Sequence, residues 1–324
     1  MTLNELAAFF ADKDDIVIIG HVSPDGDCIG SALAVKHAFA RLGRRACVAL
    51  SDNVPGKYMF LPGAADICLP GELPFEPKCA FAVDVSEKHR MGACESIFDA
   101  APAKAVLDHH ETNPGFGDVY HVEGDRASTG EIAMEFIKLL GVEPDTDIAE
   151  CVFVAVCTDT GNFNFKNTDE RAYAAASECV RYGAQVEKLT KKAFRERSLA
   201  ASKLLGEALS RIETAYDGKI AYTYVDEALL EKTGAKLEEA SRISNYLNEI
   251  TGVMVGVYFE RRNGATKVSW RSACDISVAK IAGIFGGGGH DAAAGATVNE
   301  DMQTAIGMVI SATEEALKGF ESGC

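Results

Sequence analysis

Residues 16–31 read IVIIGHVSPDGDCIGS, and this stretch decides how the N-terminal half of the chain is expected to fold. The apolar run from Ile16 to Ile19 has the length and composition of a buried strand. Cys28 to Leu42 then carries apolar residues at helical spacing and stops at a glycine, which predicts a helix. Between them, Pro24 and Gly26 favour a tight turn. The stretch therefore predicts a strand, a turn and a helix.

Further strands of the same kind follow along the first half of the chain. Short apolar runs at Ala46 to Leu50, Cys79 to Val83 and Ala105 to Leu107 alternate with amphipathic stretches. This alternation is typical of a parallel sheet covered by helices. Ser128 and Glu131 have the spacing of a capping box, which predicts that a helix begins there. We therefore expect an α/β fold with an N-terminal, mostly parallel sheet flanked by helices.

The length and the pattern of the second half predict a second domain. A chain of 324 residues exceeds the size at which a single core usually stops growing. We predict a first domain over residues 1–185, a helical connector over residues 186–216, and a smaller mixed-sheet α/β domain over residues 217–324. In the last part, Asn263-Gly264 is typical of the turn of a β-hairpin.

Composition excludes some classes of function. The 48 Asp and Glu against 32 Lys and Arg leave a net charge of −16, so the chain lacks the cations that long double-stranded nucleic acid requires. A small phosphorylated substrate is still compatible, because a bound metal reverses the local field. The ten cysteines form no C-x-x-C pair, and no apolar run reaches the length of a membrane span. The N-terminus also lacks a basic leader. We therefore expect a cytoplasmic protein with reduced thiols and no membrane partner.

Three of the predicted strands end in side chains of the kind that binds metals. His21 follows the first strand, Asp84 follows Cys79 to Val83, and the Asp-His-His sequence at 108–110 follows Ala105 to Leu107. The carboxyl ends of parallel strands meet at one edge of a sheet, where the ligand sites of open α/β sheets lie. We therefore expect these side chains to converge, although they are far apart in the sequence.

Two more segments add carboxylates to this edge. Asp25 and Asp27 lie on the loop after His21, and the acidic residues before Ile148 to Val156 favour a helix that delivers Asp159 at its end. Imidazole with several carboxylates suits Mn²⁺ or Mg²⁺ better than structural zinc. Two such ions about 3.5 to 4 Å apart polarise a phosphoryl group and activate water. Each acid alone would more often be a turn or cap residue, but four converging segments predict a two-metal phosphoesterase.

These motifs resemble those of a known family. HVSPDGDCIGS, the strand end at Asp84, DHH at 108–110 and TDTGNF at 158–163 are similar to the four motifs of the DHH phosphoesterase family. WRS at 270–272 and GGGGHDAAAG at 286–295 resemble the DHH-associated C-terminal domain of its oligoribonuclease and 3′-phosphoadenosine 5′-phosphate phosphatase subgroup. The resemblance implies that the first domain is catalytic and that the last one binds substrate.

The resemblance also implies two divalent ions that share one ligand. One ion would be held by His21, Asp25 and Asp84. The other would be held by Asp27, Asp84, His109 and Asp159. Mn²⁺ is the ion we expect, with Mg²⁺ or Co²⁺ as alternatives.

Other residues would act on the substrate. By the same resemblance, His110 would face the substrate as a phosphate ligand or proton donor, and Asp108 would orient the histidines. A hydroxide between the ions would be the nucleophile. In the second domain, the implied substrate-binding residues are Arg271, Ser272, Gly287, Gly288, Gly289 and His290.

The function implied is hydrolysis of very short nucleotides. These would be oligoribonucleotides of a few residues, linear dinucleotides such as pApA, and 3′-phosphoadenosine 5′-phosphate. A cyclic-dinucleotide phosphodiesterase and a pyrophosphatase or polyphosphatase are the alternatives with the same chemistry. The alternative outside this class of enzymes is a nucleotide sensor without catalysis. A sensor could lose metal ligands, whereas this chain keeps every one that the family pattern implies. A homodimer is the assembly we expect if the chain is not a monomer.

Overall fold

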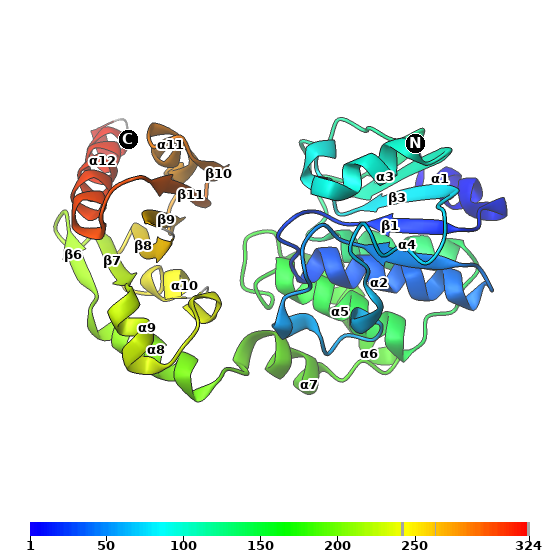
Figure 1. Cartoon of the computed structure of the whole chain (residues 1–324), viewed down its shortest axis with the longest axis horizontal. Helices are drawn as coiled ribbons and strands as arrows, with labels where there is room; N and C mark the ends of the chain where they lie inside the picture. The colour runs from blue at the N-terminus through cyan, green and yellow to red at the C-terminus, as the bar shows by residue number, and fades with distance from the viewer. Residues whose placement is uncertain (241–242, 263, 323–324) are drawn as a thin grey trace. The chain divides into compact units, whose positions relative to one another are not determined.

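The computed structural model describes residues 1–240, 243–262 and 264–322 (Figure 1). The chain forms two compact units, Met1–Glu196 and Arg197–Cys324. Each unit contains one sheet, with five strands in the first and six in the second. The α/β fold class is therefore confirmed. The finer division at residues 185 and 216 stays a prediction.

The sheet of the first unit is parallel throughout. Its strand order is β2-β1-β3-β4-β5, and every neighbouring pair runs in the same direction. The strands are β1 (Ile16–Ile19), β2 (Ala46–Ala49), β3 (Cys79–Val83), β4 (Ala103–Asp108) and β5 (Val119–Val122). β1 and β3 are buried at every position, as expected for strands covered on both faces.

Helices cover both faces of this sheet (Figure 1). Ile16 and Ile18 pack into one core, and Val17 and Ile19 into another, because successive strand residues point to opposite faces. α2, α4 and α5 contribute to the first core, and α3 to the second. The helices are α1 (Leu3–Phe9), α2 (Gly26–Arg41), α3 (Glu95–Ala100), α4 (Thr129–Leu139), α5 (Thr146–Asp159), α6 (Glu170–Arg181) and α7 (Val186–Thr190).

The helix α5 was expected from its acidic first turn, and the structure confirms it. Its N-cap is Asp145, whose side chain accepts a hydrogen bond from Ile148 N. α2 packs against α5 at Gly30, where an added Cβ would lie 2.4 Å from Cys151 O. Glycine at this position therefore lets the two helices that carry Asp27 and Asp159 approach closely.

The predicted capping box of α4 is only half formed. Ser128 Oγ accepts a hydrogen bond from Glu131 N at 3.4 Å. The Glu131 carboxylate, however, has no hydrogen-bond partner among the described residues, and its nearest charge is Arg126, at 3.6 Å. The expectation that Glu131 returns a hydrogen bond to Ser128 was wrong, because the carboxylate turns towards this guanidinium instead.

The second unit contains a mixed sheet with the order β10-β11-β9-β8-β7-β6. Among the described strands of this sheet, β7 and β8 form the one parallel pair. Asn263, in the predicted turn between β8 and β9, lies outside the described residues. The strands are β6 (Glu213–Ala215), β7 (Ile220–Val225), β8 (Val255–Arg262), β9 (Ala265–Ser272), β10 (Gly288–His290) and β11 (Ala293–Val298).

Helices cover both faces of this second sheet as well. Trp270 is fully buried in a core that includes residues of α11 and α12, and donates a hydrogen bond from Nε1 to Thr313 Oγ1 at 3.2 Å. A second core is formed with α8, α9 and α10. The helices are α8 (Leu199–Ser210), α9 (Glu227–Thr233), α10 (Ile243–Leu247), α11 (Val278–Ile284) and α12 (Met302–Ser322).

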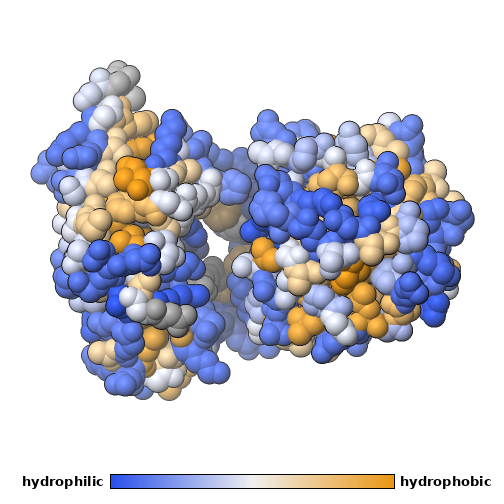
Figure 2. Space-filling view, turned by 45° about the horizontal axis from the view of Figure 1, so that its top comes forward, coloured by the Kyte–Doolittle hydropathy of each residue, from blue (hydrophilic) through white to orange (hydrophobic). Residues whose placement is uncertain are grey.

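The surface is predominantly hydrophilic on the face shown in Figure 2, with small hydrophobic areas between. The most exposed large apolar side chains are Leu199, Ile284, Tyr173 and Phe165. The cysteines of the described residues carry free thiols, and most of them are buried. Among the described residues, no helix combines the length and hydropathy that are needed to cross a bilayer.

Candidate metal centre

The candidate ligands lie at the carboxyl edge of the first sheet. His21 follows β1, Asp84 follows β3 directly, and His109 follows β4. Because β3 lies between β1 and β4, Asp84 lies between the two histidines. Asp159 is the last residue of α5 and reaches the same edge from a helix.

Three carboxylates gather around His109. Its Nε2 atom lies 3.3 Å from Asp159 Oδ2, 3.6 Å from Asp84 Oδ1 and 3.7 Å from Asp27 Oδ2. Ligand atoms of Asp27, His109 and Asp159 all lie within 4.8 Å of one another. The structure thus brings together the residues that were predicted to hold one of the two ions.

A second group forms around His21. Its Nε2 atom lies 3.4 Å from Asp84 Oδ2 and 3.8 Å from Asp25 Oδ1. The two oxygens of Asp84 therefore face different histidines, as a shared ligand requires. Cys28 also offers its sulfur within 4.8 Å of ligand atoms of His21 and Asp84. This position was not predicted, because Cys28 was expected to be one of the reduced thiols of the core, where it is indeed fully buried.

Both imidazoles are oriented by a backbone carbonyl. His21 Nδ1 donates to Val22 O at 2.8 Å, and His109 Nδ1 donates to Arg126 O at 3.1 Å. Because a carbonyl only accepts, Nδ1 must carry a proton in both rings, which leaves each Nε2 as the ring nitrogen available to a metal ion. A hydrogen bond of this kind is the usual support of a metal-binding histidine.

The carboxylates have strongly perturbed pKa values. Burial, together with the charge of Asp84, raises the pKa of Asp27 to about 7. Burial and the neighbouring carboxylates, Asp27 first among them, also raise the pKa of Asp159 well above its usual range. Burial works in the same direction on Asp84, but His21, His109 and His110 outweigh it and hold its pKa below the usual range. The group therefore holds more buried acid than its histidines neutralise, and the oxygen-rich set fits hard divalent cations.

Asp84 also has an unusual backbone conformation. Its φ is 60°, in the left-handed region, which Asp and Asn adopt more readily than most residues. Asp84 N donates to Leu107 O at 3.0 Å, which fixes the turn against β4. Conformations of this kind concentrate at functional sites, where the surrounding structure maintains them.

Asp108 lies behind the histidines and is fully buried. Its Oδ1 accepts from His110 Nδ1 at 2.8 Å and from His109 N at 2.9 Å, and its Oδ2 accepts from Asn113 Nδ2 at 2.6 Å. Burial alone would lower the pKa of His110, but the bond to Asp108 raises it overall. The side chain of His110 is 28% exposed, so its Nε2 is the ring nitrogen left for a substrate. The sequence did not reveal the part that Asn113 plays in holding Asp108.

The predicted substrate-binding residues of the second unit lie on and around one three-stranded part of its sheet. Arg271 on β9 pairs with Ala293 on β11, which in turn pairs with His290 on β10. Directly paired residues point to the same face, so Arg271 and His290 share a face with a small side chain between them. Ser272 is adjacent to Arg271 and donates from Oγ to Cys274 O at 2.7 Å.

The glycine run has structural reasons of its own. Gly287 N donates to Ala282 O at 2.9 Å, so this N–H group closes the end of α11. A Cβ at Gly287 would lie 2.2 Å from Gly295 O, and one at Gly289 would lie 2.5 Å from Ala293 O. Gly288 is exposed and would meet no neighbouring atom. Close packing on β11 thus accounts for Gly287 and Gly289 without a ligand.

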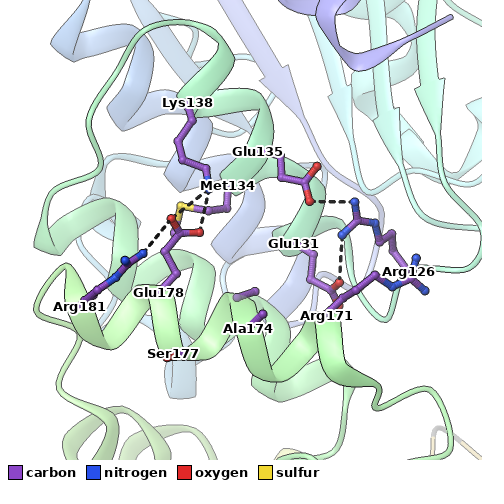
Figure 3. A pocket seen from close by; sticks show the side chains of 11 residues that line it. Arg126, Glu131, Met134, Glu135, Lys138, Arg171, Ala174, Ser177, Glu178 and Arg181 are labelled. Atoms are coloured by element: carbon purple, nitrogen blue, oxygen red, sulfur yellow. Dashed lines mark hydrogen bonds and ion pairs between the residues drawn. The ribbon is translucent and has the colours of Figure 1, made fainter.

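A separate pocket of about 500 Å³ lies between α4 and α6 (Figure 3). None of the candidate ligands is among its lining residues, which include Arg126, Glu131, Lys138 and Glu178. Some of its charged side chains pair across it, as Lys138 and Glu178 do at 2.8 Å (Figure 3). The pocket is therefore separate from the candidate metal centre.

Imidazoles and carboxylates around two positions, at the carboxyl edge of a parallel sheet, define a metal-dependent phosphoesterase. Two family models match the chain: the N-terminal domain of the DHH family over residues 15–156, and the DHHA1 domain over residues 217–319. The chain belongs to the DHH family, as the resemblance in its motifs predicted.

Known relatives extend over nearly the whole chain. The bifunctional oligoribonuclease and PAP phosphatase NrnA of Thermus thermophilus is 33% identical over 95% of this chain and 91% of its own length. An exopolyphosphatase-related protein of Bacteroides fragilis shares the fold with a TM-score of 0.91 at 24% identity, over 99% of this chain and 96% of that one. The exonuclease RecJ bound to manganese is more distant, with a TM-score of 0.56 at 14% identity, over 97% and 94% of the two chains.

Proposed function

We propose that this chain is a two-metal, Mn²⁺-dependent phosphoesterase that hydrolyses short oligoribonucleotides, linear dinucleotides such as pApA, and 3′-phosphoadenosine 5′-phosphate. The observation that carries the proposal is Asp84, whose two oxygens face two different histidines within 3.6 Å. The substrate class is supported by the name of the Thermus thermophilus relative.

Each side chain then has a defined task. Two divalent ions, when bound, would polarise the phosphoryl group and activate water. His21, Asp25 and Asp84 would hold one ion, and Asp27, Asp84, His109 and Asp159 the other. His110, oriented by Asp108, would contact a phosphoryl oxygen or protonate the leaving oxygen. Burial of Asp27 and Asp84 keeps these two carboxylates away from competing water.

Arg271 is the residue of the second unit that best fits a phosphate ligand. The guanidinium is half-buried, and no carboxylate among the described residues pairs with it. Burial lowers its pKa, which indicates a charge that is incompletely compensated within the chain. An anionic substrate would supply the missing partner, and His290 on the same face would supply a second donor. Ser272 and residues 287–289 would line this position.

The first experiment is a substrate panel with purified protein. The panel contains pApA, short RNA, 3′-phosphoadenosine 5′-phosphate, cyclic di-AMP and pyrophosphate, each with Mn²⁺, with Mg²⁺ and with a chelator. We expect turnover of the first three substrates with Mn²⁺ and none after chelation. A preference for cyclic di-AMP or pyrophosphate would refute the substrate class, and hydrolysis that survives complete chelation would refute the two-metal mechanism.

The second experiment tests the shared ligand. Asp84→Asn keeps the size of the side chain but removes its charge. Asn also adopts the left-handed conformation that this position requires. We expect less than two bound Mn²⁺ per chain and loss of turnover together. Asp118→Asn is the matched control, because Asp118 is an exposed carboxylate that accepts from Lys104 N. Full activity of Asp84→Asn would overturn the ligand assignment.

The setting of the activity is part of the same proposal. We place the protein in the cytoplasm, which is supported by the free thiols of the described residues. Light scattering on the purified chain would decide between a monomer and a homodimer.

A further inference from the structure

Thr129 stands out because it contacts two of the candidate metal ligands at once. It is the first residue of α4, after the N-cap Ser128, and it is fully buried. Thr129 N donates to Asp27 Oδ2 at 2.7 Å, and Thr129 Oγ1 donates to Asp84 Oδ1 at 2.9 Å. One residue therefore joins a carboxylate from α2 to the carboxylate that follows β3.

The surroundings of Thr129 strengthen these contacts. Gly130 N donates to the other oxygen of Asp27, Oδ1, at 2.9 Å, so the carboxylate spans two backbone donors at the start of α4. A Cβ at Gly130 would lie 2.5 Å from Ala155 Cβ, so glycine at the second position of α4 allows its start to lie close to α5. Bonds from N–H groups at a helix start to a carboxylate are charge-assisted and short.

The contacts of Thr129 favour one of the two ion positions. Asp84 Oδ1 and Asp27 Oδ2, the two oxygens that it contacts, lie 3.6 and 3.7 Å from His109 Nε2. Asp84 Oδ2, which lies 3.4 Å from His21 Nε2, accepts no bond from Thr129. Loss of the hydroxyl would therefore free Asp84 Oδ1 to rotate away from His109, while the backbone bond to Asp27 would persist.

We propose that Thr129 is a positioning residue for the ion on the His109 side, and that its hydroxyl sets the affinity of this ion without setting that of the other. The inference rests on the proposed two-metal function and deepens it. The Thr129 hydroxyl bonds to Asp84 Oδ1, the oxygen on the His109 side, where it occupies one lone pair and leaves the other for the ion. Asp84 Oδ2, on the His21 side, accepts no bond from Thr129 and would serve the other ion without it.

The test measures metal affinity, so it does not depend on turnover. Metal-free protein is titrated with Mn²⁺ by calorimetry, in a His21→Gln background for the His109-side ion and in a His109→Gln background for the other. Thr129→Val removes the hydroxyl and keeps the shape. We expect it to weaken the His109-side ion about 10- to 100-fold, in line with other residues that support metal ligands, and to leave the second affinity unchanged.

Two further variants separate positioning from folding. Thr129→Ser keeps the hydroxyl and should restore the affinity for the His109-side ion. Thr223→Val is the matched control, because Thr223 is equally buried and donates from Oγ1 to Ala208 O at 2.6 Å, in the second unit. The control should leave both affinities unchanged even if it lowers the melting temperature.

The experiment separates a failure of the two-metal function from a failure of the role proposed for Thr129. If the unmodified chain fails to bind two Mn²⁺ ions, the two-metal function itself is refuted. If it binds two, but Thr129→Val weakens neither ion or weakens both equally, only the assignment of Thr129 is refuted. Failure of Thr129→Ser to restore binding would also refute it, because the hydroxyl would then not be the active group.

Discussion

Replacing Asp108 by Asn should disable His110 while leaving the metal ions in place. The substitution keeps an acceptor for His110 Nδ1 and His109 N, but it turns the other oxygen into an amide donor. That donor would face Asn113 Nδ2, which now lies 2.6 Å from Asp108 Oδ2. Asn113 cannot easily rotate, because its Nδ2 also donates to Val85 O and its Oδ1 accepts from Gly115 N.

The expected magnitudes follow from these contacts. Two donors facing each other in a buried place leave a hydrogen bond unmade, which costs about 1 to 3 kcal/mol of stability. Loss of the Asp108 charge also weakens the interaction that opposes the effect of burial on His110, so the pKa of His110 falls. We expect kcat/KM to fall about 100- to 1000-fold, or about 3 to 4 kcal/mol in the barrier.

The assay is the pH profile of kcat/KM on pApA at saturating Mn²⁺, together with metal content by mass spectrometry. If protonated His110 takes part, the alkaline limb of the profile should move to lower pH in Asp108→Asn, with two Mn²⁺ still bound. An unchanged profile at full rate would refute the role of Asp108. A loss of metal equal to that of Asp84→Asn would show that Asp108 is itself a ligand.

Three further predictions concern charge. The urea concentration at the midpoint of unfolding should be lower at pH 8 than at pH 5 for the metal-free protein. The raised pKa values of Asp27 and Asp159 mean that the folded state binds more protons than the unfolded chain. The free energy of unfolding therefore falls as the pH rises. Mn²⁺ should abolish this trend, and equal midpoints without metal would contradict it. Glu131→Gln should stabilise the chain by about 1 kcal/mol at pH 8 and by less at pH 5, because burial raises the pKa of this carboxylate, which accepts no hydrogen bond from the described residues, so more of it is protonated at the lower pH. Destabilisation at pH 8 would show instead that its pairing with Arg126 is favourable. Arg271→Ala should raise KM for pApA about 10- to 100-fold with both Mn²⁺ ions retained, and loss of metal in that variant would exclude Arg271 as a substrate ligand.

The sequence was most informative where residue type and position act together. Ile16 to Ile19 and Cys79 to Val83 are apolar at every position, which predicted strands buried on both faces whose ends meet at one edge of the sheet, and the structure confirms both strands. This argument predicted that His21 and Asp84 lie near each other, although it could not predict the distance between them. The strand β5 was not predicted, because it is only partly buried and its sequence, VYHV, is not continuously apolar.

The supporting contacts could not be read from the sequence. Thr129 and Asn113 look like ordinary cap and turn residues, and only the placement of α4 and β4 shows which carboxylate each of them meets. Glu131 matched the spacing of a capping box, but its carboxylate faces Arg126, five residues earlier, instead of the N-cap backbone. Arg271 and His290 were both expected to bind substrate, but their common face depends on the register of three strands, which local patterns do not determine.

The strand order of the first sheet has a consequence for how such a centre could be redesigned. Neighbouring parallel strands are about 4.8 Å apart, similar to the separation of about 3.5 to 4 Å of paired catalytic ions. Whichever side chain ends the middle strand of three is therefore held midway between its neighbours. If Asp84 is the shared ligand that we propose, its sharing would follow from the central position of β3 more than from the residue found there. An engineered parallel sheet could in principle acquire a two-ion centre by placing an aspartate in a left-handed turn after a central strand and a histidine after each flanking one.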